Sequence, residues 1–390
     1  MSGANRRWTR AVVLAGSVAV SFALGGVAQQ PAAQAATALA GDQPADPGAV
    51  AHDLTADLHS RSIRVVIRKV ADWQLARAQA QPATRTWDAG MADIGLVAAS
   101  HTLGDAKLSR FVSDVGDHFQ WRIEHTLEPA NNYALAQAFI DVAGGDKRTL
   151  AAIRLRLDGD LQDPFDPDHP LWLTADDLFF EAPAAAQLSL VYDDPTYAAF
   201  VNREWHRTEK LLLNPQKHLV ASSPAAIEQR EKNSQPHLTA RANGMMLSGL
   251  VRVIAALPSD DPLRPFYILR LQEMATALAA AQGSDGLWRP GLLDAASYPQ
   301  PDVAGSTLIV YALSWGVNHH QLEAHAYLPV IEHAWQGMVS HVYQDGRVGA
   351  IPPLADDSGI YPAGSSYNYG VGAFLLAAGE VDAVSQRRHW

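Results

Sequence analysis

The 390-residue sequence contains no cysteine, and charged residues make up only 18% of it. The absence of thiols excludes disulfide bonds, thiolate zinc sites and a cysteine nucleophile. Basic residues are outnumbered, since 30 Lys and Arg stand against 41 Asp and Glu and give a formal charge of -11. This balance argues against nucleic acid as the main partner, because phosphate binding needs a basic surface. Hydrophobic residues reach 48%, so the chain is not disordered and can bury a large core.

Residues 1–35 have the composition of an export signal. Three arginines among the first ten residues form a basic start, an uncharged small and apolar stretch follows, and Ala33-Gln34-Ala35 matches a cleavage pattern. The pair Arg6-Arg7 resembles a twin-arginine signal. A membrane anchor is the alternative, but small residues dominate the stretch. We therefore expect a secreted protein with no membrane contact after cleavage, whose charge is -11 - 3 = -14 because three arginines are removed.

The rest of the chain has a spacer and one long patterned region. Residues 36–59 are rich in Ala, Gly, Pro and Asp, which predicts a flexible spacer. In residues 60–390 a pattern recurs: a small, apolar stretch, a turn with Gly, Asp or Pro, and an amphipathic stretch. In 269–278, for example, apolar residues recur at three and four positions, which indicates a helix. Period-two alternation is scarce, which argues against a large sheet.

About six such units, each of roughly 40 to 60 residues, suit helix hairpins. An apolar stretch fits an inner helix that is packed on all sides, and an amphipathic stretch fits an outer helix. The sequence therefore predicts one all-α domain over 60–390, an (α/α)6 toroid in which outer helices enclose a ring of inner ones. Loops at one rim would form the site, and long loops are expected at about 155–175, 206–240 and 284–304.

Two polar blocks stand at the start of predicted inner helices. Asp176 and Asp177 precede an apolar run, so either can cap the helix. Alternatively, one of them points into an apolar cavity, where desolvation would raise its pKa and allow it to act as a general acid. Arg241 and Asn243 open another inner helix. They serve as a surface cation and a cap, or Arg241 binds a carboxylate with its planar fork.

Tryptophan and acidic loop residues are weaker candidates. Trp87, Trp172 and Trp288 could stack on sugar rings, although core packing is the more frequent role of a tryptophan. A Pro-rich loop carries three carboxylates that could hold calcium, but no Gly or bidentate Glu follows at EF-hand spacing. These carboxylates are Asp163, Asp166 and Asp168.

Signals for a metal or a cofactor are otherwise weak. His319, His320 and His325 have no metal-site pattern and are expected to be solvated at helix ends. The sequence contains no nucleophile elbow, phosphate loop or dinucleotide fingerprint. We therefore expect neither a metal nor a cofactor.

Several blocks, taken in order, resemble glycoside hydrolase families 88 and 105, the unsaturated glucuronyl and rhamnogalacturonyl hydrolases. They are ADDLF at 175–179, RANG at 241–244, GLWR at 286–289 with LLD at 292–294, YALSWGVN at 311–318 and YGVGAFLLA at 369–377. The resemblance covers about 87–381 and implies the (α/α)6 fold. It also implies the substrate, an oligosaccharide that a polysaccharide lyase has left with a terminal 4,5-unsaturated uronic acid. In that family an Asp protonates the double bond at C4, water adds at C5, and the hemiketal opens to release the next sugar.

The resemblance also implies roles for individual residues. It places the catalytic Asp at Asp176, whereas charge logic puts Arg241 near the substrate uronate. Asn131 and Asn132 stand where the family often has acidic residues, one of which assists the catalytic Asp, and they would position Asp176. The sugar site would be lined by Trp87, Trp172, Trp288, Asn243 and Tyr369. The family motif Trp-x-Arg-Gly-Asn-Gly-Trp reads TARANGM at 239–245, so both of its aromatic residues are missing.

These departures leave two alternatives to the hydrolase open. The first is a weakened or inactive carbohydrate-binding relative with the same fold. The second is another (α/α)6 polysaccharide-degrading enzyme. It would be an inverting hydrolase if a second carboxylate faced Asp176 across the cavity, or a lyase with a Tyr base if a Tyr–His pair lay there.

Overall fold

The computed structural model describes residues 43–124, 129–162, 170–353 and 359–387, and residues 129–132 by their backbone alone. The proposed export signal therefore lies outside the described residues. Twelve α-helices occur in the described part, and they fall into two sets. The inner set is α3 (Trp87–Leu103), α5 (Pro129–Ala143), α7 (Ala175–Tyr192), α9 (Ala240–Ala256), α11 (Val303–Asn318) and α13 (Asn368–Arg387). The outer set is α2 (Ser60–Gln79), α4 (Ala106–His118), α6 (Ala151–Leu161), α8 (Pro195–Leu212), α10 (Arg264–Ala280) and α12 (Ala324–Val339).

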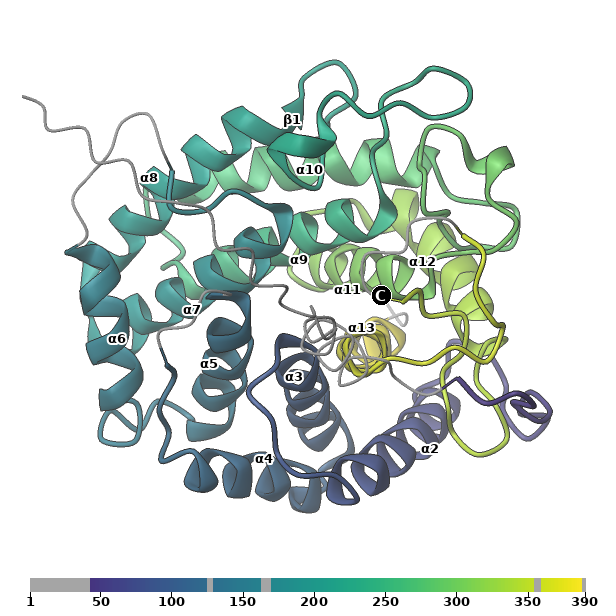
Figure 1. Cartoon of the computed structure of the whole chain (residues 1–390), viewed down its shortest axis with the longest axis horizontal. Coiled ribbons are helices and arrows are strands. Elements are labelled where there is room, and N and C mark those ends of the chain that lie inside the picture. Colours follow the sequence, from purple (N-terminus) through teal and green to yellow (C-terminus); the bar gives the residue numbers. More distant parts are fainter. Residues whose placement is uncertain (1–42, 125–128, 163–169, 354–358, 388–390) are drawn as a thin grey trace, which may run out of the picture. The chain divides into compact units, whose positions relative to one another are not determined.

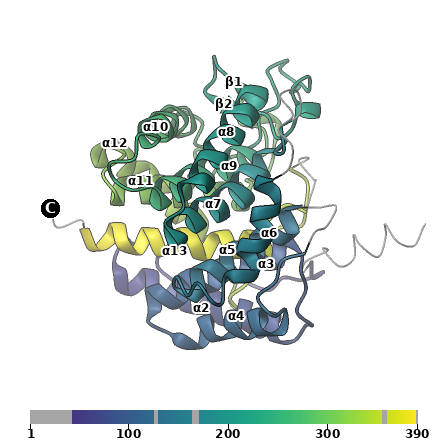
Figure 2. The ribbon, with the colours of Figure 1, turned by 90° about the vertical axis from the view of Figure 1, so that its left-hand side faces the viewer.

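The inner helices form a closed ring. Each packs against the next in the order α3, α5, α7, α9, α11, α13, and α13 returns to pack against α3. The outer helices surround this ring, as Figure 1 shows along its axis and Figure 2 from the side. The predicted all-α (α/α)6 toroid is thus confirmed. None of the described helices is long and apolar enough to span a bilayer.

The two sets of helices follow from their side chains. In α11 all of the 16 residues except Val317 are buried, as an inner helix requires. In α4 the buried residues Leu108, Val112 and Val115 lie on one face, as an outer helix requires. Inner helices also touch through glycine: a Cβ at Gly372 of α13 would lie 2.0 Å from the backbone oxygen of Met91 in α3. Only glycine permits this approach.

The described part of the predicted spacer is attached to the domain. Val50 forms a β-bridge with Tyr343. On either side of it, the Ala51 amide donates to the Val342 carbonyl at 2.8 Å, and the Gln344 amide donates to the Ala49 carbonyl at 2.9 Å. Residues 49–51 of the predicted flexible spacer are therefore fixed by backbone hydrogen bonds to the loop that follows α12.

Long connections precede the inner helices, whereas short ones follow them. The segment before α9 holds β1 (Leu213–Asn214) and β2 (Leu219–Val220), which pair antiparallel, and η1 (Pro224–Ala226). The segment before α11 holds η2 (Ala295–Ser297). Two of the expected long loops are thus present, while part of the third belongs to α6. The sequence pattern missed α2 and the long connection before α13.

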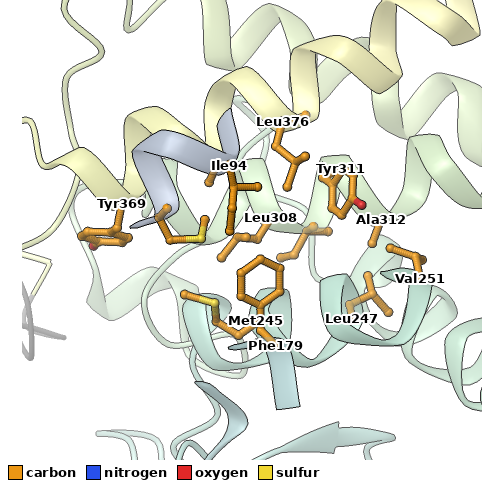
Figure 3. Close-up of a cluster of buried hydrophobic side chains, with 14 of the residues drawn as sticks. Ile94, Phe179, Met245, Leu247, Val251, Leu308, Tyr311, Ala312, Tyr369 and Leu376 are labelled. Carbon is orange, nitrogen blue, oxygen red and sulfur yellow. The ribbon is translucent and has the colours of Figure 1, made fainter. Parts of the chain in front are cut away.

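Apolar side chains fill the centre of the ring. Figure 3 shows Ile94, Phe179, Met245, Leu308 and Leu376 pointing toward one another from five inner helices. All five are fully buried or nearly so. Met245, which replaces a family aromatic residue, belongs to this core and cannot serve as a sugar platform. The ring is therefore closed below its rim by a packed floor.

Asp93 should make stability depend on pH. It is buried in α3, where it lines a small cavity together with Gln74 and Asn368, and burial alone raises its pKa to about 8. Because the folded protein keeps this proton and the unfolded chain does not, the free energy of unfolding should fall as the pH rises from about 4 to about 8. The fall is at most about 1.4 kcal/mol per pH unit.

Asp93→Asn should remove this contribution. Relative to the parent protein, we expect the variant to be more stable at about pH 7.5 than at about pH 5. Urea unfolding at the two pH values measures the difference. An equal effect of the substitution at both would show that Asp93 ionises in the folded protein as it does in water.

Candidate active site at the rim of the ring

The starts of the inner helices meet at one rim. Trp87 and Tyr369, near the starts of α3 and α13, have ring centroids 5.3 Å apart. Asp176 and Arg241, each the second residue of its helix, join α7 to α9. Helix N-termini carry partial positive charge, so this rim favours an anionic ligand.

The Asp176–Arg241 pair is the chemical centre of this rim. Arg241 Nη1 lies 2.9 Å from Asp176 Oδ2. The Asp176 side chain is 28% exposed and the Arg241 side chain is 17% exposed, so solvent reaches both. A carboxyl group that can exchange protons thus stands beside a guanidinium that can bind a carboxylate.

The neighbouring Asp177 has a different role. Its carboxylate accepts hydrogen bonds from the amides of Leu173 and Thr174, each at 2.8 Å, and its own amide donates to the Thr174 hydroxyl. These contacts form a capping box at the start of α7. Burial raises the pKa of Asp177 despite these bonds. The carboxyl with the burial-raised pKa is therefore the cap, whereas Asp176 is partly exposed and paired with a cation.

Aromatic side chains form a wall near the pair. The half-buried Trp87 lies 5.6 Å from Phe180 and 5.3 Å from Tyr369 between ring centroids. Tyr369 is fully buried, and its hydroxyl donates to the Pro352 carbonyl at 2.8 Å. Phe180 lies one turn beyond Asp176 on α7. Trp87 is thus the predicted aromatic residue that reaches the rim, and Tyr369 supports it from behind.

Trp172 and Trp288 do not line the site. Trp172 is 1% exposed and packs edge-on against Phe200 of α8 at 5.5 Å. Trp288 is fully buried, and its Nε1 donates to the Leu278 carbonyl at 2.7 Å. The expectation that both stack on sugar is therefore wrong. Each inserts from a rim loop toward the outer helices, where it buries more apolar area than at the surface.

Asn243 is likewise a structural residue and not a ligand. It is fully buried, its Nδ2 donates to the carbonyls of Val220 and Thr239, and its Oδ1 accepts from the Val220 amide. These bonds fasten strand β2 to α9. We expect Asn243→Ala to lower the free energy of unfolding by about 1–3 kcal/mol, because it leaves buried backbone groups unpaired. Chemical denaturation measures this, and unchanged stability would contradict it.

Other predicted residues lie outside what the structure describes. Asn131 and Asn132 are in the first turn of α5, but their side chains are not among those described. The same holds for the whole of the proposed calcium loop, residues 163–169. His319 stacks on Trp315 at 4.3 Å between ring centroids. Within the described ranges, no group of three His, Cys, Asp or Glu residues is arranged to hold a metal ion.

The rim also holds a hydrogen-bonded cluster that sequence reasoning missed. The Tyr298 hydroxyl donates to Glu231 Oε2 at 2.6 Å, and Glu231 Oε1 lies 2.8 Å from His237 Nδ1. The Glu231 side chain is only 3% exposed. The Leu292 amide donates to the Leu238 carbonyl and joins the two loops that carry these residues. No spacing rule connects residues 67 positions apart, so only the paired loops reveal them.

A closed double ring of helices, with a partly open acid–guanidinium pair and an aromatic wall at one rim, is an (α/α)6 fold with a candidate active site at that rim. The model of glycosyl hydrolase family 88 matches residues 66–384, and the chain belongs to this family. The protein is therefore a glycoside hydrolase of the unsaturated uronyl hydrolase type.

One curated relative agrees with this assignment, and two solved structures share the fold. The chain is 27% identical over 344 residues to the unsaturated 3S-rhamnoglycuronyl hydrolase of Formosa agariphila, which covers 83% of this chain and 91% of the relative. Its fold is similar to that of a family 88 glycosyl hydrolase from Bacteroides vulgatus, with a TM-score of 0.74 and 23% identity over 83% of this chain and 98% of the other. The polysaccharide lyase BACCELL_00875 has a similar fold too, with a TM-score of 0.77 and 24% identity over 84% of this chain and 98% of the other.

Proposed function

We propose that this protein removes a terminal 4,5-unsaturated uronic acid from lyase-generated oligosaccharides by hydration of the double bond. The observation that carries the proposal is the Asp176–Arg241 pair at the rim. The unsaturated uronate places its carboxylate on C5, next to the C4 carbon that must be protonated. A cation and an acid in contact with each other match these two neighbouring positions.

The pair suggests how substrate binding prepares the acid. A substrate carboxylate that binds Arg241 takes over the cation that Asp176 contacts in the free protein. Asp176, released from that contact, then lies next to C4 and can act as the general acid of the reaction.

Protonation of C4 by Asp176 leaves a positive charge that C5 shares with the ring oxygen. Water adds to C5, and the Asp176 carboxylate accepts the proton that this water loses. The hemiketal at C5 opens, and the next sugar leaves from C1. Overall, one water molecule is consumed and the C4–C5 double bond disappears.

The substrate class can be tested directly. The name of the Formosa agariphila relative supports an unsaturated uronate linked to rhamnose. Lyase-generated oligosaccharides from pectin, glycosaminoglycan and ulvan-type polymers would be incubated with the protein. We expect ultraviolet absorbance of the double bond to be lost most rapidly with uronyl–rhamnose linkages. No loss with any of the three would refute the proposed hydrolase.

A lyase is the second candidate, and one contact favours it. The Tyr298 hydroxyl lies 3.5 Å from His237 Nδ1, which is the kind of pair that a Tyr-base lyase needs. However, the Tyr298 hydroxyl donates a hydrogen bond to Glu231 Oε2 at 2.6 Å. A phenol that acts as this donor is not available as a base. The same assay separates the two reactions. A lyase acting on intact polymer would increase the ultraviolet absorbance, whereas the hydrolase decreases it on cut oligosaccharides.

We also propose that the protein is exported through its first 35 residues. The support is the basic start, the apolar stretch and the cleavage pattern. Replacement of Arg6 and Arg7 by lysine should retain the protein inside the producing cell if the twin-arginine route is used. Fractionation of producing cells tests this, and export of the lysine variant would argue for a general secretory signal.

A further inference from the structure

A second polar cavity lies at the other end of the inner helices. Arg252 follows Arg241 by 11 residues along α9, which corresponds to about 16 Å at 1.5 Å per residue. The cavity that Arg252 lines has a volume of about 300 Å³. Its polar lining comes from five inner helices and consists of His101, Thr102, Asp141, Arg252, Tyr311 and Glu380. This cavity is thus separate from the Asp176–Arg241 rim.

Arg252 is the most deeply buried charge of this cavity. Its side chain is 9% exposed, and its Nη2 lies 2.6 Å from Asp141 Oδ2. Asp141 also accepts a hydrogen bond from Gln187 at 2.8 Å. Arg252 Nε is buried and has no acceptor among the described residues. The guanidinium is therefore only partly satisfied by the protein, and a buried donor of this kind is unfavourable without a further acceptor.

Two further groups give the cavity both donors and acceptors. The Tyr311 hydroxyl interacts with Arg252, and burial raises the pKa of Tyr311 to about 12, so it stays protonated. The Glu380 carboxylate accepts from Asn318 Nδ2 at 2.6 Å, and burial raises the pKa of Glu380. The lining thus combines a guanidinium, a phenol and two carboxyl groups.

The signs of these charges select the ligand. An anion would meet Asp141 and Glu380, and a cation would meet Arg252. A neutral polyhydroxyl molecule can donate to the carboxyl groups and accept from Arg252 and Tyr311. One wall of the cavity is apolar, since Ile94, Val97 and Leu376 line it and Leu376 lies next to Tyr311 (Figure 3). Such an apolar floor suits the C–H face of a sugar ring. The volume is at the lower end of small-molecule pockets, which begin at about 300 Å³.

From this combination of cavity, charge and apolar floor, we propose that the end of the ring opposite the active-site rim holds a second binding site, for a neutral pyranose monosaccharide. The site does not depend on the proposed hydrolysis, because no step of that reaction uses these residues.

Titration calorimetry and saturation-transfer NMR test this site with L-rhamnose and D-xylose as neutral probes and D-glucuronate as the anionic probe. We expect saturable binding of a neutral sugar and none of glucuronate at this site. Tyr311→Phe removes one hydroxyl and should weaken binding about tenfold. Ala98→Leu places a larger side chain in the cavity, which Ala98 lines, and should abolish binding.

Matched variants distinguish binding in this cavity from binding at the active-site rim and from a loss of folding. Tyr267→Phe removes a buried hydroxyl in α10, away from the cavity, and should leave binding unchanged. Arg241→Ala changes the active-site rim and should also leave it unchanged. Ala98→Leu and Tyr311→Phe both keep the buried Arg252–Asp141 ion pair, so neither leaves an unpaired buried charge. Thermal melts will show which of the two variants is folded. Absence of neutral-sugar binding, binding that survives Ala98→Leu, or binding lost in Arg241→Ala would overturn the proposal.

Discussion

Asp176→Asn should reduce turnover of unsaturated oligosaccharides by about 10²- to 10⁴-fold, the usual contribution of a general acid. The amide keeps the size of the side chain but cannot deliver a proton to C4. Substrate should still bind, because Arg241 is retained. The variant lacks only the Asp176 carboxylate, which competes with the substrate carboxylate for Arg241. Steady-state assays of double-bond absorbance measure kcat, and calorimetry measures binding.

Asp177→Asn is the matched control for this prediction. It removes the same charge one residue away, but from a carboxylate that caps α7. We expect a loss of about 1 kcal/mol in stability and a kcat close to that of the parent. If instead Asp177→Asn abolished turnover and Asp176→Asn did not, the roles assigned to the two residues would be reversed. A folded parent protein that bound these sugars without turnover would support the inactive carbohydrate-binding relative.

Arg241→Met should raise the KM for uronate-terminated substrates by about 10²-fold. Hydrogen bonds to charged groups contribute about 1.5–3 kcal/mol, and this one is partly shielded from solvent. The variant removes the guanidinium without removing the acid, so we expect kcat to change less than KM. Initial rates across substrate concentration measure both constants.

Arg289→Met provides the comparison. Arg289 also pairs with a carboxylate near this rim, through two hydrogen bonds of 2.9 and 3.0 Å to Asp285. Because that pair does not involve Asp176, KM should change by less than about threefold, as expected for a surface ion pair. Equal increases of KM in the two variants would mean that Arg241 acts only through the net charge of the rim.

The sequence predicted the helical toroid because the signal for it is local and repeated. Residues of α11 are small or apolar on all sides, and those of α4 are apolar on one side. The composition of each helix therefore indicates whether it belongs to the inner or the outer ring. The attachment of residues 49–51 in the predicted spacer was missed for the opposite reason. Its composition is typical of a flexible segment, yet its backbone pairs with residues near 343, almost 300 positions away.

The site was predictable in part. The order of blocks along the chain led to Asp176 and Arg241, and the structure brings these two side chains into contact. It could not separate the tryptophans, because Trp87, Trp172 and Trp288 all precede or begin elements near the rim. Which of them faces solvent depends on how each loop packs over the outer helices. The Tyr298–Glu231–His237 cluster was unpredictable too, since two separate loops supply its members.

By itself, the sequence determined the class of fold and the alternation of inner and outer helices, because helical periodicity and capping act over a few neighbouring positions. Only the tertiary structure decided which acid of the Asp176–Asp177 pair meets a cation, which aromatic residues reach the rim and that Arg252 and Asp141 meet below the packed floor. Successive residues on a helix point about 100° apart. What each side chain touches therefore depends on where the neighbouring helices lie, and closure of the ring sets those positions.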